Sequence, residues 1–192
     1  MAIKVFIDQG HNPQGVNGGA EYGGVREQDV TYPVGIYLRD ILQRDGRFEA
    51  RTSRNRPDEV LGTSNTTSLA TRVQAANAWG ANYFFSIHCN ANVNPAINGT
   101  EVYVYRAGSV ASALARDILD AIVERVGTRD NGVRVNPSLY VLRRTVMPAN
   151  LIELAYLSND GDRQKLQNDQ YAFAYAIYVG LCRYLGYVPK VG

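Results

Sequence analysis

The chain has 192 residues, of which 45% are hydrophobic and 20% are charged, and its formal net charge is +2. This composition is typical of a folded domain and excludes a disordered chain. The small positive charge comes without a run of basic residues, so nucleic acid is not expected as a partner. Two cysteines are too few for a disulfide framework. The length suits one unit, and we expect residues 1–192 to form a single domain.

No stretch of the sequence is apolar for long enough to span a membrane. A strand pattern begins at Ile3, which leaves no room before it for a signal peptide. We therefore expect a chain without a membrane span or a signal peptide, and the sequence leaves its export route open.

The first half of the chain alternates strand and helix patterns. In order, it predicts a strand over 3–8, a glycine-rich loop over 15–24, a helix beginning at Glu27, a strand over 48–53, a polar loop over 55–68 and a helix over 69–79. The helix that begins at Glu27 has apolar residues at helical spacing from Val30 to Leu42.

The second half continues the alternation. It predicts strands over 82–88 and 100–105 joined by a turn over 92–99, a helix over 110–126, strands over 139–142 and 151–157, and a helix over 171–185. Alternating strands and helices predict an α/β fold: a single three-layer domain with a mostly parallel, twisted sheet and helices on both faces.

Only two histidines occur in the chain, and each stands near the expected end of a strand. His11 follows the first strand, and His88 ends the strand over 82–88. The carboxyl ends of parallel strands lie at one edge of a sheet, so we expect the two rings to be neighbours. One such histidine is usually a hydrogen-bonded structural residue. Two of them favour a shared metal site, because imidazole is the commonest protein ligand of this kind.

Two carboxylates extend this hypothesis. Glu27 opens a helix after the glycine-rich loop and can return to the same edge as a third ligand. Its alternative role is structural, because a negative charge at a helix N-terminus is stabilising by about 0.3–1 kcal/mol. Glu153 lies in an apolar strand, where alternation puts Leu151, Ala155 and Leu157 on its side. An unpaired buried charge costs several kcal/mol, so Glu153 is expected to act as a general base beside the metal. A structural ion pair with Arg143 is the alternative.

Six motifs occur in a fixed order along nearly the whole chain. They are Asp8-Gln-Gly-His11, Glu27, Ser68-Leu-Ala-Thr-Arg72 with Ala76-Asn77, Ser86-Ile-His88-Cys-Asn90-Ala91, Gly99-Thr-Glu101-Val-Tyr103, and Pro148-Ala-Asn-Leu-Ile-Glu153-Leu-Ala-Tyr-Leu-Ser-Asn159. Each motif alone has low specificity. In this order they resemble the zinc-dependent N-acetylmuramoyl-L-alanine amidases of the type 3 amidase family.

This resemblance implies a hydrolase that cuts the amide between the lactyl group of N-acetylmuramic acid and L-alanine in peptidoglycan. It implies one Zn²⁺ per chain, with His11, Glu27 and His88 as ligands and Glu153 as the catalytic carboxylate. Peptidoglycan or a muropeptide would be the substrate, and the chain would act on the bacterial cell wall as a monomer. The resemblance covers autolysins, phage lysins (endolysins) and sporulation enzymes alike.

Four further residues are expected near the substrate or behind the ligands: Asp8, Arg72, Asn90 and Arg143. Asp8 and Asn90 are equally well explained by strand-end and turn hydrogen bonds. Cys89 stands where the family commonly has alanine, and a strand neighbour of His88 points to the opposite face, so we assign Cys89 to the core.

Two other functions remain open. A zinc hydrolase of carboxypeptidase type would use similar ligands, but the chain lacks His-Glu-x-x-His and the His-x-x-Glu spacing. A wall-binding module without activity could use the 13 tyrosines to stack on sugars. Some relatives carry a helical plug that a partner protein removes. The segment 89–100 is too short and too poor in helix formers for such a plug, so we expect activity without an activator.

Overall fold

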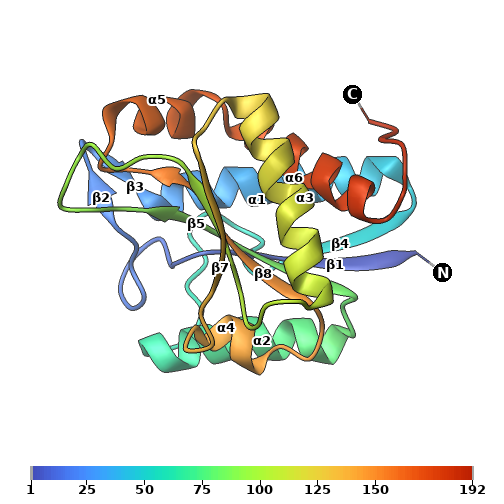
Figure 1. Cartoon of the computed structure of the whole chain (residues 1–192). Coiled ribbons are helices and arrows are strands. Elements are labelled where there is room, and N and C mark those ends of the chain that lie inside the picture. The colour runs from blue at the N-terminus through green and yellow to red at the C-terminus, as the bar shows by residue number, and fades with distance from the viewer. Residues whose placement is uncertain (1, 192) are drawn as a thin grey trace.

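Six strands form one twisted sheet in the order β4-β1-β5-β8-β6-β7 (Figure 1). In this computed structural model, which describes residues 2–191, they are β1 (Ile3–Gln9), β4 (Phe48–Thr52), β5 (Tyr83–Asn90), β6 (Thr100–Val104), β7 (Asp130–Val135) and β8 (Ala149–Tyr156). The neighbours β4, β1, β5 and β8 are mutually parallel. The strand β6 runs antiparallel to β8, and β7 runs parallel to β6. The carboxyl ends of β1, β5 and β8 therefore meet at one edge.

Helices cover both faces of the sheet (Figure 1). They are α1 (Glu27–Asp45), α2 (Asn65–Trp79), α3 (Val110–Val126), α4 (Tyr140–Arg144), α5 (Asp160–Asn168) and α6 (Gln170–Tyr184). One face carries α1, α3, α5 and α6, and the other carries α2 and α4. The predicted three-layer α/β fold with a mostly parallel sheet is thus confirmed. No helix between residues 2 and 191 has both the length and the apolar content to cross a membrane.

Alternation along the central strands separates two cores. In β5, Phe85 and Ile87 pack among α1, α3 and α6, whereas Phe84 packs on the other face with residues of α2 and α4. Successive side chains of a strand point to opposite faces, so Ser86 and His88 follow Phe84 onto the face of α2 and α4. His88, at the carboxyl end of β5, remains partly exposed on that face.

The segment predicted as a strand over 139–142 is the helix α4, and this prediction was wrong. The backbone N–H of Arg143 donates to the carbonyl of Leu139 at 3.0 Å, which closes a helical turn. Val141 and Leu142 are buried by this turn in the core beside α2. A run of four apolar residues has no periodicity that separates a strand from one helical turn, and tertiary packing selected the helix.

The polar segment predicted as a loop over 55–68 also contains the start of α2. Ser64 accepts a hydrogen bond from the backbone N–H of Thr67, whose hydroxyl oxygen accepts one from the backbone of Ser64. This capping box begins the helix at Asn65, before its first apolar residue. Four elements were not predicted: the strands β2 (Glu21–Tyr22) and β3 (Val25–Arg26), which form a hairpin, the edge strand β7, and α5.

A change of register in β8 alters which side chains share the face of Glu153. The Cα of Glu153 pairs with that of His88, but the next pair is Tyr156 with Asn90, so β8 gains one residue there. Ala155 and Leu157 consequently join the core under α1, α3 and α6. Strict alternation had placed them beside Glu153, and that expectation was wrong.

Candidate metal centre and catalytic carboxylate

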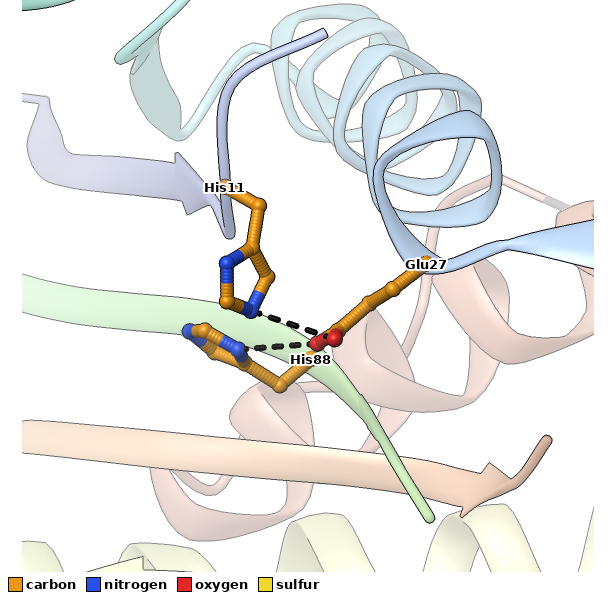
Figure 2. Close-up of side chains that lie close together, drawn as sticks. All are labelled: His11, Glu27 and His88. Atoms are coloured by element: carbon orange, nitrogen blue, oxygen red, sulfur yellow. Dashed lines mark hydrogen bonds and ion pairs between the residues drawn. The ribbon is translucent and has the colours of Figure 1, made fainter. Parts of the chain in front are cut away.

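His11, Glu27 and His88 converge from three segments that are distant in the sequence (Figure 2). One donor atom from each lies within 4.8 Å of the others. His11 Nε2 is 3.1 Å from Glu27 Oε2, and His88 Nδ1 is 3.0 Å from Glu27 Oε1. The rings remain partly exposed, whereas the Glu27 side chain is buried. Two imidazoles and one carboxylate in this proximity fit a divalent transition metal with a remaining open position.

The turn after β1 directs His11 into the cluster. His11 has a φ of 68°, a left-handed conformation that is uncommon for residues other than glycine and that recurs at functional sites. Its Nδ1 lies 3.3 Å from the carbonyl oxygen of Asn17, which assigns Nδ1 as the donor. A neutral ring then keeps the Nε2 lone pair for a metal, and a protonated ring donates from Nε2 to Glu27.

Glu27 is fixed from both sides of the cluster at the start of α1. The backbone N–H of Ala20 donates to Oε2 at 3.0 Å, and that of Cys89 donates to Oε1 at 2.9 Å. Burial alone would raise the pKa of this carboxyl, but hydrogen bonds from His11 and His88 hold the pKa well below its usual range. Glu27 therefore stays a carboxylate, as a metal ligand requires.

His88 is oriented by a chain of hydrogen bonds on the same sheet face. The Ser86 hydroxyl donates to Asp8 Oδ2 at 2.7 Å, so its oxygen accepts from His88 Nε2 at 3.2 Å. This chain assigns the Nε2 proton. A neutral ring then keeps the Nδ1 lone pair for a metal, and a protonated ring donates from Nδ1 to Glu27. Such support behind a ligating histidine fixes both ring orientation and tautomer.

Arg72 lies behind the turn that carries His11. It is buried, and Nη1 donates to Asp8 Oδ1 at 2.7 Å and to the Gln9 carbonyl at 2.5 Å. Nη2 donates to the His11 carbonyl at 2.8 Å and to Asn12 Oδ1 at 3.0 Å. Burial would raise the pKa of Asp8, but the Arg72 guanidinium and its hydrogen bond outweigh this effect and lower it. Asp8 and Arg72 thus form a buried ion pair that positions a predicted ligand.

Two glycines permit the close approach of these segments. A Cβ on Gly10 would lie 2.6 Å from His88 Cε1, and one on Gly19 would lie 2.7 Å from the Cβ of Glu27. Neither position could hold a larger residue without displacing a predicted ligand. A cavity of about 130 Å³ lies beside the two imidazoles, with apolar walls from Leu69, Leu139 and Leu151.

Glu153 lies next to the cluster, one strand away from His88. The Cα atoms of the two residues are paired between β5 and β8, so their side chains share a face. Its Oε2 is buried and has no hydrogen-bond partner within residues 2–191. Burial raises the pKa of Glu153 well above its usual value, and the negative charges of Glu27 and Glu101 add to this effect. Arg143 is exposed on α4, and no ion pair joins it to Glu153 in the described part of the chain.

The remaining expected residues have simpler surroundings. Asn90 Oδ1 accepts from the backbone N–H of Ala91, which is the turn hydrogen bond considered as its alternative role. Cys89 is buried in the core below α1, as expected, and burial raises the pKa of its thiol well above the usual value. A protonated, inward-facing thiol is a core residue and a poor ligand.

A second buried carboxylate was not selected from the sequence. Glu101 is 2% exposed, and its Cα is paired with that of Glu153 across β6 and β8. The hydroxyls of Tyr103, at 2.7 Å, and of Tyr156 donate to it, and Arg134 Nε lies 3.2 Å from Oε2. The argument applied to Glu153, a charge in an apolar strand, would have identified Glu101 too. Its tyrosine and arginine partners carried no signal in the sequence.

Comparison with known proteins identifies the family of the chain. A family profile described as N-acetylmuramoyl-L-alanine amidase matches residues 5–183. The chain belongs to this family. The N-acetylmuramoyl-L-alanine amidase CwlM of Bacillus licheniformis is 35% identical over 174 residues, which are 88% of this chain and 62% of that protein. The amidase LytC of Bacillus subtilis is 34% identical over 187 residues, covering 94% of this chain and 35% of LytC.

A solved structure of the same family supports the fold. The N-acetylmuramoyl-L-alanine amidase from Clostridium difficile 630 superposes with a TM-score of 0.82 and 32% identity, over 96% of this chain and 97% of that one. The chain therefore spans nearly all of that family member but only 62% and 35% of the two Bacillus amidases.

Proposed function

We propose that this chain is a zinc-dependent N-acetylmuramoyl-L-alanine amidase and that residues 1–192 are its catalytic domain. It would cut the amide between the lactyl group of N-acetylmuramic acid and L-alanine of peptidoglycan, and would thus act on the bacterial cell wall. Membership of the family supports the reaction. The observation that carries the mechanism is Glu153, with a buried, unpartnered carboxylate oxygen on the sheet face of His88.

The donor set fits the proposed metal. His11, Glu27 and His88 present two ring nitrogens and a carboxylate within 4.8 Å, and each is oriented by a backbone or side-chain partner. Zinc bound by such a set supplies Lewis acidity, which polarises a carbonyl and makes water more acidic near neutral pH. The assignment of these three residues as ligands rests on this geometry and on the family resemblance.

Glu153 would move the proton. Its raised pKa brings the carboxyl toward the range in which a general base accepts a proton from water and returns it to a leaving group. The water would attack the lactyl carbonyl carbon, the carbon–nitrogen bond would break, and the proton would pass from Glu153 to the alanine nitrogen. The products would be a free muramic acid carboxylate and a new L-alanine amino terminus.

The test combines product analysis with zinc stoichiometry. Purified cell wall should release new L-alanine amino termini without new reducing sugar ends, and the chain should hold one zinc.

Glu153→Gln should keep zinc while activity falls by about two to four orders of magnitude, the usual loss for a general base. His88→Ala should lose the zinc, whereas Cys89→Ala should keep it. A fully active Glu153→Gln variant, or full zinc in His88→Ala, would overturn the assignment.

A further inference from the structure

The guanidinium group of Arg134, on the edge strand β7, is held through Nε, and its two terminal nitrogens point away from these contacts. Its Nε lies 3.2 Å from Glu101 Oε2 and 3.3 Å from the carbonyl oxygen of Asn131. The side chain is 50% exposed, and its two terminal nitrogens have no hydrogen-bond acceptor among residues 2–191. An arginine held through Nε presents both terminal N–H groups as a fork, the geometry that binds a carboxylate in a bidentate manner.

Glu101 makes this arrangement rigid. It is buried and also accepts hydrogen bonds from the Tyr103 and Tyr156 hydroxyls. Burial, together with the hydrogen bond to Glu101, raises the pKa of Tyr103 to about 12, so this phenol remains a donor at neutral pH. Three donors hold this carboxylate in place, and an arginine attached to a fixed, buried anchor loses little conformational freedom when it binds a ligand.

The position of Arg134 relative to Glu153 suggests what it binds. β6 separates their two strands, and Tyr103 is paired with Arg134 while Glu101 is paired with Glu153. Two strand spacings and an offset of two residues along β6 together give about 12 Å, the length of three to four extended peptide residues. A peptide that leaves the scissile amide along this face would therefore bring the next residue or two within reach of the guanidinium.

The charge of this side of the site agrees with an acidic ligand. The segment 131–152, which contains Arg134 and α4, carries three arginines and no aspartate or glutamate. Arg143 and Arg144 are both exposed. Such a surface attracts carboxylates before any close contact forms.

We propose that Arg134 is a specificity-determining residue that anchors a free carboxylate one or two residues beyond the scissile amide in an acidic stem peptide. This inference rests on the proposed function of the site. It predicts that the enzyme prefers a stem peptide with a free α-carboxylate at its second residue over the same peptide with an amide there.

The experiment uses two soluble substrates that differ in one group, N-acetylmuramoyl-L-alanyl-γ-D-glutamyl-L-lysine amide and N-acetylmuramoyl-L-alanyl-D-isoglutaminyl-L-lysine amide, in both of which the γ-carboxyl is already bound in an amide. We expect kcat/KM of the unchanged chain to favour the acid by about tenfold, the effect of a charged hydrogen bond at a half-exposed site. Raising the salt concentration should reduce this preference. Arg134→Gln should abolish the preference by lowering kcat/KM for the acid, with less than about a twofold change for the amide.

Two further variants control for charge and folding. Arg106→Gln removes an exposed arginine two residues beyond the carboxyl end of β6 and should keep the tenfold preference. Arg134→Lys keeps a positive charge beside Glu101 but lacks the fork, and should show an intermediate preference. Because Arg134→Gln also removes a partner of Glu101, thermal unfolding of each variant is measured. If Arg134→Gln does not fold, the substrate preference of Arg134→Lys is the deciding result.

The outcomes separate this proposal from the proposed function. An equal rate for acid and amide in the unchanged chain, or a preference that survives in Arg134→Gln, overturns the anchor while the amidase activity stands. An equal loss on both substrates in a folded Arg134→Gln variant shows a structural role only and also overturns it. Absence of L-alanine release from either substrate and from cell wall overturns the proposed function itself.

Discussion

Gly10→Ala tests how the metal centre depends on close packing of two strands. Gly10 follows β1, and its φ lies in a range that alanine adopts, so the change introduces no backbone strain. A Cβ there would lie 2.6 Å from both His88 Cε1 and the carbonyl oxygen of Ile87. Ordinary contact begins at 3.4 Å, so the ring would have to retreat by 0.8 Å, the difference between 3.4 and 2.6 Å.

The displacement sets the expected size of the effect. Zinc sites keep ligand distances within about 0.2 Å of their ideal values, so a ligand displaced by several times that tolerance binds poorly. We expect zinc affinity to fall by about 10- to 100-fold, as for other disruptions behind a ligand. The contact with the Ile87 carbonyl adds an overpacking cost, and the free energy of unfolding should fall by about 1–3 kcal/mol.

The assay is a competition titration with a zinc chelator, together with urea unfolding of the zinc-free chain. Gly18→Ala is the matched control, because a Cβ at Gly18 meets nothing within 4 Å and its φ is also compatible with alanine. It should retain the zinc affinity and stability of the unchanged chain. Unchanged zinc affinity in Gly10→Ala would refute the packing argument, even if the variant were less stable.

Three other predictions concern the ion pairs and the open site. Arg72→Met should lower the free energy of unfolding by about 3–5 kcal/mol in urea, because it leaves Asp8 buried and unpaired, and adding Asp8→Asn should restore part of that loss. Hydrogen bonds from Arg47 lower the pKa of Asp45 to about 2, so this stabilisation is present above about pH 4 and is lost as the pH falls toward 2. Between pH 5 and pH 2.5, the free energy of unfolding in urea should fall by about 1–2 kcal/mol less in Asp45→Asn than in the unchanged chain. The zinc-loaded chain should hydrolyse soluble muropeptides alone, and a requirement for proteolysis or a second protein would contradict this.

The sequence identified candidate site residues where a titratable side chain interrupts an apolar strand pattern. His88 and Glu153 are titratable residues in strands that are mostly apolar, and both lie on the same face of the sheet. Arg72 is different, because an arginine within a helix is normally solvated. Its burial depends on the polar turn after β1 that supplies its acceptors, and helical periodicity contains no information about that turn.

The errors have equally specific causes. The strand β7 was missed because its sequence, Asp-Asn-Gly-Val-Arg-Val, has a glycine and charges, which is typical of an edge strand and weak as a pattern. The extra residue in β8 turns Tyr156 toward Glu101, and no rule of alternation predicts where a bulge occurs. The Glu101 cluster therefore became visible only when β6, β7 and β8 were seen side by side.

The order of strands in the sheet also determines when the centre can exist during folding. The neighbours β1, β5 and β8 are separated by more than 50 residues of chain, so their pairing must close long loops. Topologies of this kind fold more slowly than local ones. As the chain emerges from the ribosome, His11 and Glu27 appear early, but the support of Ser86 and the strand of Glu153 come much later. A metal ion can therefore find its complete set of donors only after β5 has docked beside β1, and the proton-transferring carboxylate joins last.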